Sequence, residues 1–163
     1  MTKFPALERV KINRKAIDHE CAFQDAFQGF ERVGAIKSIF GNRTVNVLSS
    51  LKIKFSDKPW YMWIDDDNGR LMLGKKYMRT GRKLYLYLDV VHELTHIRQH
   101  HEGRELFDEK YEYVDRPTEI EAYRNAVNEA KRLGMSEKEI RSYLYMSWFT
   151  KPQFDRLLKH CGL

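Results

Sequence analysis

Two histidines and a glutamate lie together in the segment Val91-His92-Glu93-Leu94-Thr95-His96. Residues four apart are neighbours on one face of a helix, so the imidazoles of His92 and His96 can reach the same metal ion. Glu93, next to the first histidine, then lies where a metal-bound water would need a general base. This spacing constrains the fold more than any other pattern in the chain, because it requires a helix here and a third metal ligand from another element.

The third ligand is expected to be a carboxylate from the segment that begins at Pro117. A catalytic zinc ion takes three protein ligands and keeps one position open. The longer pattern HExxHxxGxxH is not met, because Gln99 and Glu102 stand where it requires glycine and histidine. A two-histidine, one-carboxylate set is therefore predicted.

Glu121 is the predicted carboxylate ligand, and Glu119 is its rival. Asn125 lies four residues after Glu121, one turn along the same face, and could accept a hydrogen bond from a ligand histidine. A simpler explanation for Glu121 is a capping box with Thr118, which needs no metal.

The residues before the motif predict a mainly helical start followed by a small sheet. Apolar positions between residues 17 and 27 recur near helical spacing, and residues 51–55 alternate as a half-exposed strand does. Residues 59–64 and 70–73 read as a hairpin, because Asn68-Gly69 tolerates the positive φ of a tight turn. Residues 83–89 alternate like another strand.

The second half of the chain predicts helices. One runs from about Asp89 to His101, with a single helix starting near Arg82 as the alternative to the strand at 83–89. Further helices are expected over 117–133, from a capping box at Ser136–Glu139 toward 147, and from Thr150 toward 160. The fold class is thus α+β. A single domain over 1–163 is expected, with an N-terminal helical region (1–50), a catalytic core (51–133) and C-terminal helices (134–163).

The stretch Asp89-Val-Val-His-Glu-Leu-Thr-His96 resembles the active-site helix of the gluzincin zinc metallopeptidases. Glu121-Ala122 is similar to that family's second-helix motif. Asn125 stands where the family has a histidine-orienting acid, which is a departure. The resemblance covers roughly residues 50–133, and by size the chain is closest to the archaeal minigluzincins.

This resemblance implies a zincin-like fold with a small antiparallel sheet, an active-site helix, a second ligand-bearing helix and C-terminal helices. It implies Zn2+ held by His92, His96 and Glu121, with Asn125 as a residue that orients a ligand histidine. The implied activity is hydrolysis of peptide bonds in a peptide or protein substrate, through a zinc-bound water and with Glu93 as general base. The edge strand of the hairpin would pair with the extended substrate.

Other functions stay open. The net charge is +6, and one run has no acid within it: Lys75, Lys76, Arg79, Arg82 and Lys83. Such a run suits nucleic acid as a further partner, although a solvated face is the simpler explanation. The alternative function is a zincin-fold zinc-binding module with weak or no peptidase activity, associated with nucleic acid. A third hypothesis treats the motif as accidental in an interaction protein.

Apolar runs, cysteines and the C-terminal residues give further expectations. No apolar run is long enough to cross a membrane, and Cys21 and Cys161 form no CxxC pair, so a cytoplasmic monomer is expected. A separate hypothesis concerns latency: His160 or Cys161, near the C-terminus, would occupy the open coordination position of the zinc ion. Six residues are candidate donors of a hydrogen bond to an oxyanion: Tyr111, Tyr113, Tyr143, Tyr145, His100 and His160.

Overall fold

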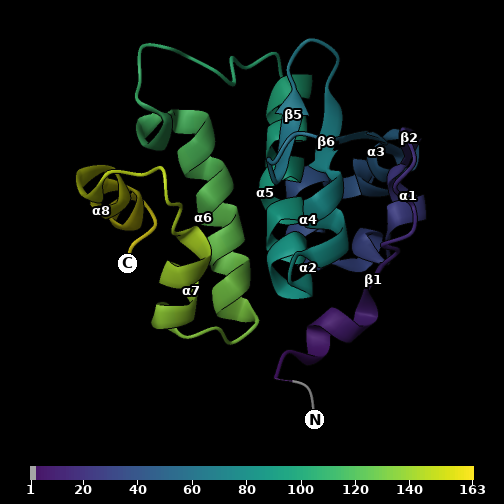
Figure 1. Cartoon of the computed structure of the whole chain (residues 1–163), viewed down its shortest axis with the longest axis horizontal. Helices are drawn as coiled ribbons and strands as arrows, with labels where there is room; N and C mark the ends of the chain where they lie inside the picture. Colours follow the sequence, from purple (N-terminus) through teal and green to yellow (C-terminus); the bar gives the residue numbers. More distant parts are fainter. Residues whose placement is uncertain (1–2) are drawn as a thin grey trace.

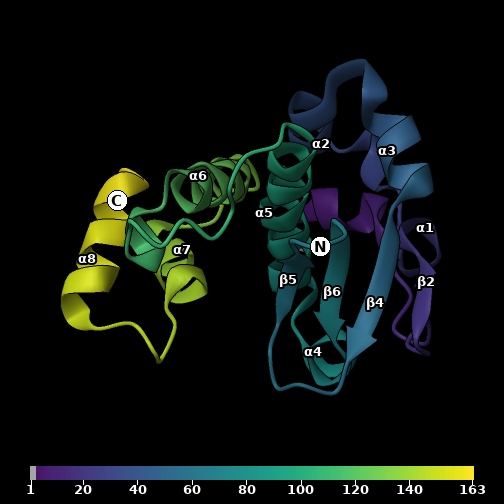
Figure 2. The same cartoon turned by 90° about the horizontal axis from the view of Figure 1, so that it is seen from above.

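The computed structural model describes residues 3–163 and has a mixed α+β architecture (Figures 1 and 2). The strands are β1 (Lys11–Ile12), β2 (Glu20–Ala22), β3 (Phe27–Gln28), β4 (Lys52–Ser56), β5 (Met62–Asp65) and β6 (Arg70–Gly74). The α-helices are α1 (Phe23–Ala26), α2 (Gly34–Phe40), α3 (Thr44–Ser50), α4 (Lys75–Thr80), α5 (Lys83–His101), α6 (Pro117–Arg132), α7 (Glu137–Leu144) and α8 (Lys151–His160). Short 3-10 turns are η1 (Pro5–Arg9), η2 (Phe30–Arg32), η3 (Gly41–Arg43) and η4 (Tyr113–Asp115). Within residues 3–163, no helix combines the length and apolar character that crossing a bilayer requires.

The main sheet has the strand order β2-β4-β6-β5, so β5 is an edge strand. The hairpin of β5 and β6 is confirmed, and Gly69 in its turn has φ +66°. A Cβ atom there would lie 2.8 Å from the His100 ring, so the hairpin tip packs closely against the end of α5. The predicted all-antiparallel sheet is wrong in one pairing, because β4 and β6 run parallel. After β4 the chain first forms the edge strand β5, and it then returns as β6, which lies between β4 and β5.

α5 stands between the sheet and the C-terminal helices (Figure 2). The predicted strand at 83–89 is wrong, and the alternative of a single helix beginning near Arg82 is confirmed. Leu84, Leu86 and Leu88 are all buried although they alternate in sequence. A helix covered on most sides shows no polar face, and its periodicity is therefore lost from the sequence.

The N-terminal region is less helical than predicted. Residues 20–28 form β2, α1 and β3 instead of one helix, and Phe23, Phe27 and Phe30 pack on one another in the core. Gly29 has φ +87°, and a Cβ atom there would lie 2.5 Å from the Arg9 carbonyl oxygen. Tertiary packing of the aromatic rings thus overrides the local helical spacing.

The predicted C-terminal helices are confirmed as α6, α7 and α8, and Ser136 forms the predicted capping box. Thr150, where the last helix was expected to begin, forms a capping box with Gln153. The predicted capping box at Thr118 is wrong. The N-cap of α6 is Arg116, and the Thr118 hydroxyl donates to the Leu106 carbonyl.

Replacing Ser136 with alanine is expected to lower the free energy of unfolding by about 1 kcal/mol, because the Ser136 hydroxyl accepts from the Glu139 amide at the start of α7. Urea unfolding followed by circular dichroism measures the loss. Ser142→Ala on the exposed side of the same helix is the control, since its hydroxyl bonds only the Lys138 carbonyl. Equal unfolding midpoints for the two variants would contradict the capping role.

Candidate metal centre

α5 places the two motif histidines side by side, as their spacing predicts. The Nε2 atoms of His92 and His96 are 3.1 Å apart, and both rings are buried. One helical turn separates the two side chains, so they point the same way from the same face.

The third member of the cluster comes from α6 and is Glu119. Its Oε2 atom lies 3.2 Å from His92 Nε2 and 3.3 Å from His96 Nε2. Only 6% of Glu119 is exposed. These three side chains form a compact group that could hold a metal ion.

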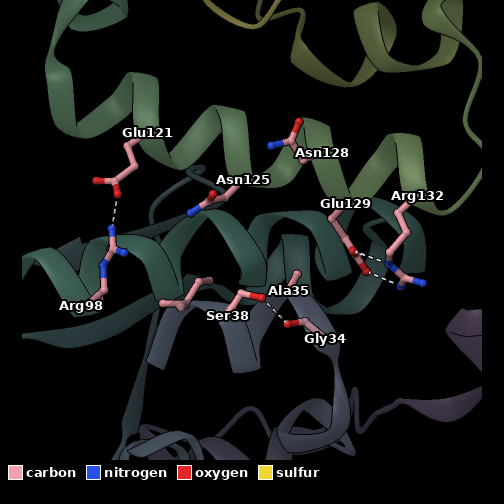
Figure 3. Close-up of a pocket in the computed structure, with 10 residues that line it drawn as sticks. Gly34, Ala35, Ser38, Arg98, Glu121, Asn125, Asn128, Glu129 and Arg132 are labelled. Atoms are coloured by element: carbon pink, nitrogen blue, oxygen red, sulfur yellow. Dashed lines mark hydrogen bonds and ion pairs between the residues drawn. The ribbon is translucent and has the colours of Figure 1, made fainter. Parts of the chain in front are cut away.

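The structure corrects the expectation for Glu121, which is not part of this group. Its carboxylate accepts hydrogen bonds from Gln99 Nε2 and Arg104 Nη1, each at 2.7 Å, and pairs with Arg98. Figure 3 shows the pair with Arg98 in a groove between α2, α5 and α6. Burial acts to raise the pKa of Glu121, but the bonds from Gln99, Arg98 and Arg104 outweigh it and hold that pKa at about 2.

Helical phase explains why Glu119 and Glu121 have different surroundings. Two residues turn a helix by about 200°, so the two side chains leave α6 in nearly opposite directions. Ala122 and Ala126 are fully buried, and their small side chains let α6 approach α5 closely. Asn125 shares a face of α6 with Glu121, as their four-residue spacing predicted, but that face lies away from His92 and His96.

Asn125 makes no hydrogen bond to His92 or His96. Its Nδ2 donates to the Thr95 hydroxyl at 3.0 Å. Gln99, three residues after His96, has the position that Asn125 was expected to have: Gln99 Oε1 lies 2.7 Å from His96 Nδ1. Its spacing from His96 was the available sequence signal, since residues three apart share a helix face.

The surroundings of Gln99 determine which nitrogen of His96 carries hydrogen. The Gln99 NH2 group donates to the Thr118 carbonyl at 3.1 Å and to Glu121. Its oxygen therefore faces His96, and His96 Nδ1 must be the donor. In the neutral ring that binds metal, His96 Nε2 then carries the lone pair that faces the cluster. Glu121 acts on the cluster indirectly, through Gln99.

The cluster fits a metal ion on two counts. In a tetrahedral zinc site with bonds near 2.0–2.1 Å, neighbouring ligand atoms are about 3.3 Å apart, and the three separations here are 3.1, 3.2 and 3.3 Å. Glu119 Oε2 is also buried without a hydrogen-bond donor. Acceptors that converge in this way require a cation or a shared proton between them.

Charge within the cluster follows the same arrangement. Burial alone would raise the pKa of the Glu119 carboxyl, but the two adjacent histidines hold it well below its usual range. Burial lowers the pKa of His92, which favours the neutral ring that binds metal. His92 Nδ1 has no hydrogen-bond partner and its ring packs against Tyr123, with the ring centroids 4.4 Å apart.

Glu93 lies beside the cluster, with Oε1 4.0 Å from His92 Nε2. Burial raises the pKa of Glu93 well above its ordinary value, and the nearby Glu119 and Asp89 carboxylates add to this shift. A carboxyl group with a raised pKa is better suited to accept and return a proton near neutral pH.

A cavity of about 500 Å3 opens next to Glu93. The edge strand β5 forms one wall through Met62 and Trp63, and α5 forms another through His92 and Glu93. The segment after α7 closes the far side with Trp148. A smaller cavity of about 110 Å3 continues to His96 and Glu119, so the cluster can be reached from the cleft.

Several tyrosines, whose hydroxyls can donate hydrogen bonds, line the cavity. Tyr113 and Tyr143, two of the residues considered from sequence, line it, and so does Tyr123, which the sequence did not single out. The hydroxyls of Tyr113 and Tyr123 are 3.0 Å apart. The cavity is not lined by Tyr111, Tyr145, His100 or His160.

The C-terminal residues have other partners. His160 Nε2 lies 2.9 Å from Asp115 Oδ1, and Cys161 is buried, which raises its pKa to about 11. Cys21 and Cys161 are both free thiols. The structure thus places neither His160 nor Cys161 at the histidine cluster.

The basic run at 75–83 is divided among several partners. Lys75 Nζ lies 3.1 Å from Asp57, Lys83 Nζ donates to the Val10 carbonyl, and the Arg82 guanidinium stacks on Tyr85. Three of its five cations are therefore engaged within the molecule.

No protein-family model, curated protein or solved structure matches this chain.

Replacing Gln99 with methionine is expected to weaken metal binding at the cluster by about 10- to 100-fold, the usual cost of losing a group that orients a metal-binding histidine. Competition with a chromophoric chelator measures the affinity. Asn125→Ala is the matched control, because Asn125 bonds Thr95 rather than a ligand. If Gln99→Met binds the metal ion as tightly as the unchanged protein does, His96 needs no orienting partner.

Proposed function

We propose that this chain is a zinc-dependent metallopeptidase with a zincin-like fold, which hydrolyses peptide bonds in a peptide or protein substrate. One observation carries the proposal: the acceptor atoms of His92, His96 and Glu119 converge beside the buried carboxylate of Glu93. Glu119 Oε2 in this group has no hydrogen-bond donor. A site that only stabilised the fold would have no use for that carboxylate.

The residues of the cleft suit acyl transfer to water. A zinc ion held by His92, His96 and Glu119 would supply a Lewis acid and lower the pKa of a bound water toward neutrality. Glu93 takes the proton from the attacking water and returns it to the leaving amine. Tyr113 and Tyr123 line the cavity, and the oxyanion that develops on the scissile carbonyl would accept a hydrogen bond from one of their hydroxyls.

The edge strand supports an extended substrate. β5 pairs with β6 on one side, and among the described residues no strand pairs with its other side. A peptide added there would form main-chain hydrogen bonds with β5 while its scissile bond lies over Glu93. We extend the proposal to a monomer in the cytoplasm, in agreement with two unpaired cysteines.

Metal analysis and a peptidase assay test the proposal together. Purified protein is expected to hold one zinc ion per chain and to cleave a quenched fluorescent peptide mixture, with loss of activity on chelation and recovery on adding zinc. Failure to bind zinc after loading would overturn the metal centre. Stoichiometric zinc without hydrolysis of any peptide in the mixture would favour a zinc-binding module instead.

A further inference from the structure

The cavity beside Glu93 is acidic although the protein carries a net charge of +6. Its charged lining residues are Asp89 and Glu93, and among the described residues no lysine or arginine lines it. Together with Glu119, the site holds three carboxyl groups. Asp89 is the one of the three that the proposed hydrolytic chemistry does not use.

Asp89 lies on α5, three residues before His92, or about 4.5 Å along the helix axis. Its Oδ1 accepts a hydrogen bond from the Tyr143 hydroxyl at 2.8 Å, and its Oδ2 accepts one from Tyr77. A carboxylate has about four acceptor positions, so two tyrosine hydroxyls leave capacity for another donor. Because the group is removed from bulk water, a cation that reaches it gains more than it would at the surface.

Aromatic rings make up much of the remaining lining. Trp63, Tyr123, Tyr143 and Trp148 all face this cavity. The faces of such rings attract organic cations, and several rings around one site bind ammonium groups. At the mouth, Lys58 Nζ already lies 4.4 Å from the centre of the Trp60 ring, so one ring there binds a cation of the protein itself.

We propose that this cavity binds a cationic group of the substrate next to the scissile bond, with Asp89 as its counter-charge and the aromatic rings as its walls. The group is a lysine or arginine side chain, or the free α-amine of a peptide, which offer the same chemistry. The link to cleavage rests on the proposed peptidase function, but binding of the cation does not. Asp89 and the aromatic walls would then determine specificity.

The competing explanation is that Asp89 only holds Tyr77 and Tyr143, and so attaches α4 and α7 to α5. Asp89→Asn tests the difference, because it keeps an oxygen acceptor and removes the charge. Tyr77→Phe is the matched control, since it removes one of these hydrogen bonds and keeps the charge. Tyr77 does not line the cavity.

Intrinsic fluorescence reports occupancy directly, because all three tryptophans of the chain, Trp60, Trp63 and Trp148, line this cavity. Full-length Glu93→Gln protein, chosen to prevent turnover, is titrated with peptides blocked at both ends that differ at one residue: lysine, arginine, acetyl-lysine or norleucine. A second set has a free amino terminus. The same titration is repeated with Asp89→Asn and Tyr77→Phe added.

Lysine and arginine peptides are expected to bind about tenfold more tightly than the acetyl-lysine and norleucine peptides. Asp89→Asn should reduce this ratio to about one, and Tyr77→Phe should preserve it. A preference confined to peptides with a free amino terminus would support the proposal with the α-amine as the cation. Equal affinity for charged and neutral peptides in the protein that retains Asp89 would overturn it, and that comparison does not depend on the folding of any Asp89 variant. Absence of zinc or of cleavage would count against the peptidase function alone.

Discussion

Glu119→Gln is expected to abolish stoichiometric zinc binding and peptidase activity, whereas Glu121→Gln is expected to retain both. Glu119 Oε2 lies within 3.3 Å of both histidine Nε2 atoms, and the amide would remove the only negative charge in this ligand set. We expect zinc affinity to fall by more than about 100-fold, beyond the usual cost of losing a residue that only supports a ligand. Metal content after dialysis, measured by mass spectrometry, gives the result.

Glu121→Gln is the matched control because it makes the same chemical change two residues away on α6. Its effect should be smaller, since Glu121 reaches the cluster only through Gln99. Thermal unfolding of both variants separates loss of metal from loss of fold. Retention of zinc by Glu119→Gln together with its loss from Glu121→Gln would mean that α6 presents its other face to the histidines.

Glu93→Gln is expected to lower kcat by about 100- to 10,000-fold while zinc stays bound, which is the range for removing a general base. Glu93 is 7% exposed, and it borders the cavity and the cluster without being one of the three metal-binding side chains. Initial rates on a fluorescent peptide and the zinc content of the same preparation are measured together.

Glu102→Gln, at the exposed end of the same helix, should keep its activity, because Glu102 pairs only with Arg98. Activity retained in Glu93→Gln would exclude Glu93 as the base. Loss of zinc along with activity would instead assign Glu93 to the metal site.

Local signals in the sequence were sufficient for several parts of this protein. The spacing of His92 and His96 identified two side chains that meet in the structure, because helix geometry alone brings residues four apart together. The turn at Gly69 and the cap at Ser136 were also predicted, since backbone conformation and a neighbouring amide determine them. Each of these features depends on residues within one turn or one loop.

The choice between Glu119 and Glu121 was decided only by the tertiary structure. Both lie in α6, and their sequence neighbours favoured Glu121, but the rotation of α6 against α5 brings Glu119 to the histidines. Gln99 acquired its role in the same way, because its amide is oriented by Thr118 and Glu121 from the other helix. The first half of α5 was predicted as a strand for a related reason. A helix that is buried on most sides has no polar face, and its sequence therefore lacks the periodicity that marks a helix. Local spacing was enough to identify the residues that could bind a metal ion. The packing of α6 against α5 brings together those that meet, because long-range contacts and not local spacing set the rotation of one helix against another.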